Sequence, residues 1–423
     1  MQKMIRLAAL ALPALLLAGC AMDPQQLLQD SGLFPAENTA TLETAATPQP
    51  QTLTAYAPDG LQPALQAYAD NQQVQLNLLA DPNAVDLVML DYAPGNLVEG
   101  VDVMSDTLLA AAASRAGITE STNALPLGRS LYGYWANGSL LTALLGENGV
   151  TALQNADWEE WSDFVETLQA WLEKPSAATV TLDGSDYTLP ETKPDTLNAT
   201  GVFSEPMDRA AGYTAAMLAA GAEQTADTLT GPINGVYSAV TLEWDNLAES
   251  DETALFRRAK LTDLLAAYGS DACQSLVLIP FKCELTESDL STEEYNLTGL
   301  LDYPVLADVG SVLVRAGTDE SARKAAESAV LWLYSSGEGE NTLTKTLGVI
   351  TPWNTASDTT TLGQMQVQQA STGILPGLSL TQSQADALVA NEESLRDSTS
   401  HTAAERNAFT EAALAALGIT ETE

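Results

Sequence analysis

The sequence of 423 residues contains one histidine, His401, and three cysteines, Cys20, Cys273 and Cys283. Protein zinc sites need several cysteine or histidine ligands close together, and this composition offers no such cluster. The chain also lacks the GxSxG, P-loop and HExxH motifs that mark common hydrolases, nucleotide-binding proteins and metalloproteases. We therefore expect no metal site, no cofactor and no enzymatic activity.

Basic residues are scarce. Lys and Arg total 17 against 56 Asp and Glu, which gives a formal net charge of −39. Proteins bind nucleic acid largely through Lys and Arg that displace counterions, so we expect no nucleic-acid partner. Anionic lipid should also repel this chain, so attachment to a membrane would have to come from a lipid group.

The N-terminus, MQKMIRLAALALPALLLAGC, combines a charged head with a short apolar run. Lys3 and Arg6 form the head, and the run from Leu7 to Ala18 is shorter than the roughly 20 residues of a membrane-spanning helix. This pattern is typical of an export signal. Its ending, LAGC at residues 17–20, resembles the bacterial lipobox, whose cysteine receives a diacylglyceryl group before cleavage.

We therefore predict a lipoprotein signal peptide over residues 1–19 and a lipidated Cys20 as the first residue of the mature protein. Residues 20–50 are rich in Gln, Thr, Ala and Pro, without periodicity, and are interpreted as a flexible tether. The protein would then be exported and anchored to the outer face of the bacterial cell membrane. An ordinary secretory signal with a chance cysteine is the alternative.

Cys273 and Cys283 flank the apolar run CQSLVLIPFKC. Outside the cell they could oxidise, and a bridge across this run would contribute about 2–3 kcal/mol. We predict a disulfide between them, with two unpaired small hydrophobic residues as the alternative.

Strand and helix patterns alternate after residue 50. LTAYA (53–57) alternates like a strand, LQPALQAYAD (61–70) has helical spacing, and DLVML (86–90) is a continuous apolar run of the kind buried in a parallel sheet. Farther on, Asp157 is a good N-cap for a helix whose Trp158, Trp161 and Trp171 we interpret as packing residues. The pattern predicts an α/β architecture.

Several segments resemble those of one known family. They are LPLGRSLYGYWANGSLL (125–141), ADWEEWSDFVETLQ (156–169), FRRAKLTDLLAAYG (256–269), GSVLVRAGTDESARKAAESAVLWLYSS (310–336) and LGVITPW (347–353). Their order resembles the extracellular solute-binding proteins of ABC importers, in particular the sugar-type family. Two positions depart from that family: Ala136 stands where an aromatic residue is usual, and Gly138 where a lysine is usual.

The resemblance implies a two-lobed α/β fold, like that of the periplasmic binding proteins, with several hinge crossings. The first lobe would take residues 51–125 and 284–337, and the second lobe 126–283 and 338–423. Such a protein would be a monomer that captures a small neutral solute, in this case an oligosaccharide, between its lobes and presents it to ABC permease subunits. Closure would follow because a solute that contacts both lobes binds the closed state better.

Seven residues are candidates for contacting the solute. Tyr56 and Asp59 follow the first predicted strand, and Asp91 and Tyr92 follow DLVML, so both pairs lie at carboxyl ends of strands, where ligands of open α/β sheets bind. Trp135 lies just past the first hinge crossing. The resemblance adds Tyr268, where the family often carries a stacking aromatic, and Trp353, on the segment that re-enters the second lobe.

Two other functions remain open from the sequence. The chain could be a surface lipoprotein that binds a polymer or a protein without transport, as an adhesin or sensor would. It could also bind a peptide or another solute in place of a sugar. Closure of the lobes on a ligand would distinguish a transport receptor from an adhesion module.

Overall fold

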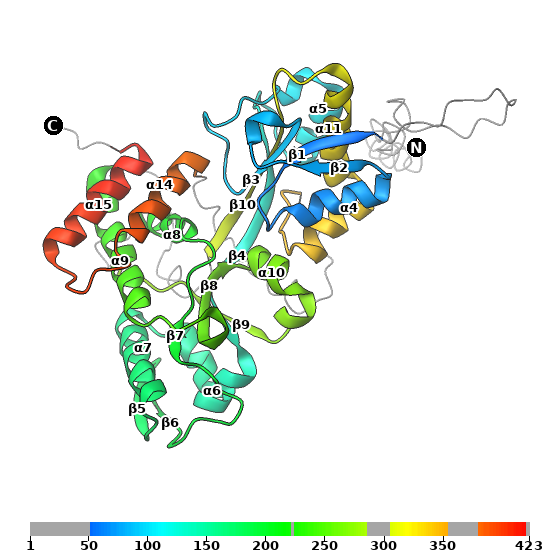
Figure 1. Cartoon of the computed structure of the whole chain (residues 1–423). Helices are drawn as coiled ribbons and strands as arrows, with labels where there is room; N and C mark the ends of the chain where they lie inside the picture. Colours follow the sequence, from blue (N-terminus) through cyan, green and yellow to red (C-terminus); the bar gives the residue numbers. More distant parts are fainter. Residues whose placement is uncertain (1–50, 221–223, 286–304, 354–379, 420–423) are drawn as a thin grey trace, which may run out of the picture.

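The computed structural model describes residues 51–220, 224–285, 305–353 and 380–419. The predicted signal peptide, Cys20 and the tether lie outside these residues. One eight-stranded sheet runs through the described part in the order β2-β1-β3-β10-β4-β8-β7, and β9 also pairs with β4. Helices pack around this sheet in two lobes (Figure 1).

The first lobe is an α/β unit that uses both an early and a late part of the chain. Its strands are β1 (Thr52–Tyr56), β2 (Gln75–Leu78) and β3 (Leu87–Leu90), and its helices are α4 (Gln62–Gln72), α5 (Thr107–Arg115), α11 (Glu320–Ser335) and α12 (Gly337–Asn341). Short 3₁₀ turns lie at Pro82–Ala84 and Val103–Ser105. β1 pairs in parallel with both β2 and β3. Every residue of β3 is buried, as its continuous apolar run predicts.

Two long strands connect the lobes. They are β4 (Leu125–Asn137) and β10 (Val305–Val314), which pair antiparallel. β10 also pairs with β3 of the first lobe, and its register with β4 shifts at Gly310. Gly310 has φ +135°, and a Cβ there would collide with the carbonyl oxygen of Leu90, so this crossing point requires glycine.

The second lobe is assembled on the far halves of these two strands. Its elements are α6 (Gly138–Asn155), α7 (Trp158–Glu173), the hairpin β5 (Ala178–Leu182) and β6 (Ser185–Leu189), β7 (Gly201–Phe203), a 3₁₀ turn (Asp251–Thr253), β8 (Ala254–Lys260), α10 (Leu261–Cys273) and β9 (Leu276–Pro280). Asp157 caps α7 by accepting a hydrogen bond from the Glu160 amide. Trp161 and Trp171 are buried and Trp158 packs against the same core, so the prediction that they are packing residues is confirmed.

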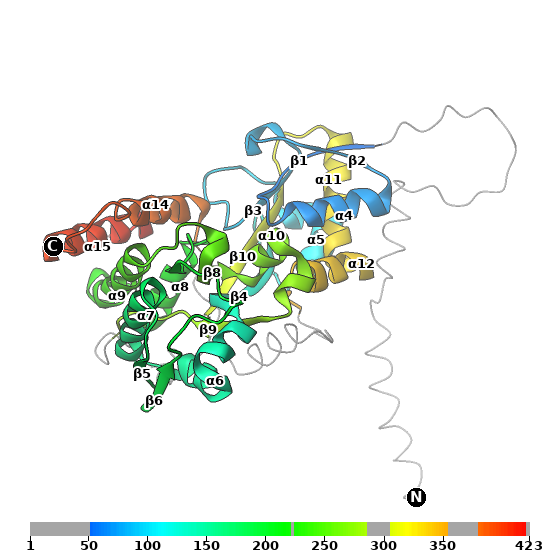
Figure 2. The same ribbon diagram turned by 60° about the horizontal axis from the view of Figure 1, so that its bottom comes forward.

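A helical layer completes this lobe. It comprises α8 (Ala211–Ala220), α9 (Ala226–Asp245), α14 (Gln382–Glu393) and α15 (Ala403–Leu417). Figure 2, like Figure 1, places α14 and α15 beside α8 and α9 and far from α5 and α11. The layer also meets the first lobe, because the Ala93 amide donates to Leu380 at 3.0 Å and the Gln382 amide donates to Ala93 at 2.8 Å.

The predicted disulfide is not present in the structure. Cys273 and Cys283 are both buried, they are not bridged to each other, and they lie in two different core clusters. The extended strand β9 separates them, and its five residues span about 16 Å at about 3.3 Å per residue. A disulfide needs Cα atoms within about 7 Å, so this strand holds the two thiols apart.

One segment packs in a different lobe from the one that its place in the sequence suggests. Leu343, Leu347 and Val349 belong to the core of the first lobe, although the sequence assigned residues 338–423 to the second. The cause is a π-helical turn, Thr342–Thr346, that packs against α4.

Candidate functional site

Charged side chains from both lobes meet where β3 ends. Tyr92, directly after β3, donates its hydroxyl to both carboxylate oxygens of Asp208 at 2.7 and 2.9 Å. Lys260, the last residue of β8, lies 2.8 Å from the same carboxylate and is only 2% exposed. Its Nζ also lies 5.3 Å from the centre of the Tyr92 ring. We call the region formed by Asp91, Tyr92, Asp208, Lys260 and Asp263 the interlobe junction.

The junction holds more carboxylates than cations. Burial raises the pKa of Asp91, and Asp208 reinforces this effect while Lys260 opposes it. Burial likewise raises the pKa of Asp263 to about 7, against the pull of Lys260. Burial would also raise the pKa of Asp208, but contact with Lys260 holds it below its ordinary value. Asp208 is therefore the ionised partner of Lys260, whereas the described residues offer Asp91 and Asp263 no equally close cation.

Asp91 is the carboxylate of the junction that is available to accept a hydrogen bond from a ligand. No group in the described part of the chain donates a hydrogen bond to its side chain, and the side chain is partly exposed. A partly buried carboxylate without a donor is a ready acceptor for a hydroxyl.

Tyr56 and Asp59 border the same region. Tyr56 is partly buried, and burial together with the nearby Asp91 raises the pKa of its hydroxyl. Asp59 is exposed and accepts a hydrogen bond from the side-chain amide nitrogen of Gln62 at 2.8 Å. A Cβ on the next residue, Gly60, would lie 3.5 Å from the Asp263 carboxylate, so this turn of the first lobe reaches the second. The structure therefore gathers four of the seven predicted residues at one place.

Asp208, Lys260 and Asp263 were not predicted from the sequence. Lys260 ends β8 and Asp208 lies in the loop after β7, so each carries the same signal that pointed to Asp91. Their pairing could not be read from the chain, because it depends on which strands become neighbours. Tyr92 also differs from expectation: it is 7% exposed and its hydroxyl is bound to Asp208, so its ring presents no open stacking face.

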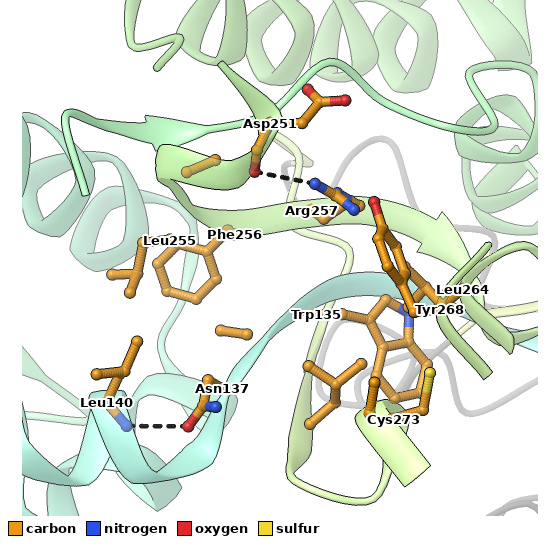
Figure 3. Close-up of a pocket in the computed structure, with 14 residues that line it drawn as sticks. Trp135, Asn137, Leu140, Asp251, Leu255, Phe256, Arg257, Leu264, Tyr268 and Cys273 are labelled. Carbon is orange, nitrogen blue, oxygen red and sulfur yellow. Dashed lines mark hydrogen bonds between the residues drawn. The ribbon is translucent and has the colours of Figure 1, made fainter. Parts of the chain in front are cut away.

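Trp135 and Tyr268 come together elsewhere, in a pocket of the second lobe with a volume of about 230 Å³ (Figure 3). Trp135 is buried and its indole N–H donates to the Ala259 carbonyl at 3.0 Å. Tyr268, on α10, is 48% exposed, and the Arg257 guanidinium lies 4.8 Å from its ring centre. We call this cavity the α10 pocket, and its remaining walls come mainly from Leu140, Leu255, Phe256, Leu264 and Leu276.

Trp353 lies in neither the interlobe junction nor the α10 pocket. Its ring lies 5.2 Å from that of Tyr334 and 5.0 Å from the Arg115 guanidinium, and both partners belong to the first lobe. The segment before it packs on the first lobe, so the expected return to the second lobe does not occur at this residue.

Arg258, Glu243 and Glu392 form a second cluster of buried charges, which we call the Arg258 cluster. Arg258 is 1% exposed and bonds to Glu243 of α9 at 2.9 Å and to Glu392 of α14 at 2.9 Å. Burial raises the pKa of Glu392 to about 7, while Arg258 opposes the rise. The ion pairs of the Arg258 cluster connect α9 and α14 of the helical layer to β8.

Within the described ranges, no group of three or more His, Cys, Asp or Glu side chains could hold a metal ion. The described helices include none that is long and apolar enough to span a bilayer.

The arrangement matches solved structures. Maltose-bound MalE3 of T. maritima has a TM-score of 0.53 and 10% identity over 87% of this chain and 99% of its own. A solute-binding protein of an ABC transporter from Agrobacterium radiobacter K84, in complex with ribitol, has a TM-score of 0.53 and 11% identity over 87% of this chain and 98% of its own. The galacto-N-biose/lacto-N-biose I-binding protein of Bifidobacterium longum has a TM-score of 0.51 and 12% identity over 89% and 100%.

The chain has the two-lobed fold of ABC-transporter solute-binding proteins. The predicted fold class is thereby confirmed. No family model and no curated protein sequence matches the chain.

Proposed function

We propose that this protein is a membrane-tethered extracellular receptor that captures a small neutral solute between its lobes for import by an ABC transporter. The observation that carries the proposal is the interlobe junction, where a two-lobed fold brings Asp91 of one lobe beside Lys260 and Asp208 of the other. A solute bound there would contact both lobes and would favour their closure.

The chemistry of the junction favours a polyhydroxyl solute. Asp59 and Asp91 offer acceptors, and an anionic solute would be repelled by these carboxylates. Hydroxyl groups of a sugar would supply the donors that Asp91 lacks, and each buried hydroxyl left unpaired would cost about 1–3 kcal/mol. The structural neighbours include complexes with maltose, ribitol and lacto-N-biose, which are all neutral polyhydroxyl molecules. We therefore take a neutral oligosaccharide as the solute.

Calorimetry with a panel of neutral oligosaccharides tests this assignment. We expect one of them to bind, and Asp91→Asn to weaken that binding about tenfold through loss of a charge-assisted hydrogen bond. Asp195→Asn, which changes an exposed aspartate of the second lobe, is the matched control and should bind normally. Binding of a peptide or amino acid in place of every sugar would contradict the solute class. An unchanged affinity in Asp91→Asn would place the site elsewhere.

We further propose that Cys20 carries the lipid anchor, that ABC permease subunits are the partner of the protein, and that the protein is a monomer. Cys20→Ala should leave the protein unprocessed or release it from the membrane fraction, because the acyl group is the expected anchor. A mature N-terminus at another residue, without an acyl group in mass spectrometry, would contradict the anchor but leave solute capture standing.

A further inference from the structure

The α10 pocket differs from the interlobe junction in place and in chemistry. Trp135 packs with Ala259 and Leu264 in a small apolar cluster next to α10. Lys260, adjacent to Ala259, directs its side chain the other way, to Asp208. Because successive residues of a strand face opposite sides of the sheet, β8 separates the pocket from the buried charges of the junction.

The size of the pocket suits a small ring system. Its volume is about 230 Å³. An apolar cavity of about 150 Å³ in another protein holds benzene, so this one has room for two fused rings. α10 bends at Gly269, which has φ +76°, and the turn beyond the bend brings Cys273 back to the pocket wall.

The walls are mainly apolar and favour an aromatic guest. Tyr268, 48% exposed, offers the accessible ring, the buried Trp135 borders the cavity, and leucines form most of the remaining wall. A saccharide placed here would find few polar partners besides Asn137, Asp251, Arg257 and Tyr268, and each hydroxyl left unpaired would cost about 1–3 kcal/mol. A planar aromatic molecule meets no such cost, and contacts between aromatic rings are worth about 0.5–1.5 kcal/mol beyond area burial.

Asn137, Asp251, Arg257 and Tyr268 bring polar groups to the pocket wall, and Asn137 offers a hydrogen-bond donor to a guest. The Asn137 side-chain oxygen caps α6 by accepting from the amides of Ser139 at 2.9 Å and Leu140 at 3.2 Å. This fixes the amide plane, and Figure 3 shows the Asn137 nitrogen on the side away from that cap. The nitrogen donates to no group in the described part of the chain, so it is available to an acceptor on a guest.

We propose that the α10 pocket binds a small bicyclic aromatic molecule that carries a hydrogen-bond acceptor, at a site separate from the solute site. The rings would lie against Tyr268 and the Trp135 side of the pocket, and the acceptor would take a hydrogen bond from the Asn137 amide. This inference does not depend on the class of solute bound at the junction.

Quinoline and indole are suitable probes, because both are bicyclic but only quinoline has a ring nitrogen that accepts. We expect quinoline to bind in calorimetry and to bind more tightly than indole. Asn137→Asp keeps a good helix cap but replaces the donor with a carboxylate, so it should weaken quinoline binding about tenfold and change indole binding little.

A second variant tests the location without relying on the cap. Leu140→Trp should fill the pocket and abolish binding of both probes, whereas Leu97→Trp, on the first lobe, should not. Unfolding curves show whether each variant folds, and Asn137→Asp remains decisive if Leu140→Trp does not. Absence of quinoline binding at millimolar concentration would overturn the proposal, as would normal binding by a folded Leu140→Trp or by Asn137→Asp.

Discussion

The two faces of β8 contrast sharply. On one face Arg258 and Lys260 are buried among Glu243, Glu392 and Asp208 and connect the lobes and the helical layer. On the other face Ala259 packs with Trp135, and Arg257 lines a largely apolar pocket. One strand thus separates a region of buried charges and hydrogen bonds from a pocket with mainly apolar walls.

This contrast shows why buried charge is not in itself a binding site. Asp208, Lys260 and Arg258 already have partners within the protein, so they set the geometry of the junction. In the described part of the chain, no group donates a hydrogen bond to the Asp91 side chain and none accepts one from the Asn137 nitrogen. We therefore propose these two side chains, and not the paired ones, as the groups that contact ligands. Four predictions test the contrast.

The largest effect is expected on the charged face. Arg258→Met leaves Glu243 and Glu392 buried without their cation, which should lower the free energy of unfolding by about 3–5 kcal/mol. Urea denaturation measures this loss. Arg129→Met removes a more exposed ion pair with Asp308 and should cost no more than about 1 kcal/mol. Equal losses in the two variants would show that burial does not distinguish the pairs.

A smaller effect is expected from the contact between the lobes. Tyr92→Phe keeps the ring but removes the hydrogen bond to Asp208, and bonds to charged groups are worth about 1.5–3 kcal/mol. Thermal and urea unfolding should show a loss in this range, with quinoline binding unchanged. A loss of quinoline binding would mean that the two faces are coupled.

The pH dependence of stability tests the raised pKa of Glu392. Its pKa rises from the ordinary value to about 7 on folding, so the folded state binds a proton that the unfolded state has released. Its contribution to stability is therefore complete at low pH and is lost as pH rises through 7. In Glu392→Gln the fall in stability between pH 5 and pH 8 should be shallower than in the parent protein. Part of the fall should persist, because the pKa of Asp263 is also raised to about 7. Identical profiles would mean that Glu392 does not titrate in this range.

The smallest effect is expected at the mouth of the pocket. Tyr268→Ala removes a half-exposed ring and its contact with Arg257, and such cation–π contacts are worth about 0.5–1 kcal/mol. The free energy of unfolding should fall by no more than this amount, while the affinity for quinoline should decrease. A larger loss of stability would show that Tyr268 is part of the core.

The sequence predicted the parts of this picture that depend on local pattern. The run at Leu87–Leu90 located a buried strand, and the end of that strand located Asp91 and Tyr92 at the junction. The partners of these residues could not be predicted, because Asp208 lies 116 positions from Tyr92 and meets it only when the lobes assemble. The positions of Trp353 and of the cysteines could not be predicted for a related reason. A π-helical turn packs the segment before Trp353 on the first lobe, and an extended strand holds Cys273 and Cys283 apart.

The most direct test of two separate sites is a titration of quinoline into the protein, with and without a saturating concentration of the oligosaccharide that it binds. We expect the same quinoline affinity in both titrations, because β8 lies between the pocket and the junction. Loss of quinoline binding in the presence of the sugar would contradict this expectation, because the two molecules would then compete for one site.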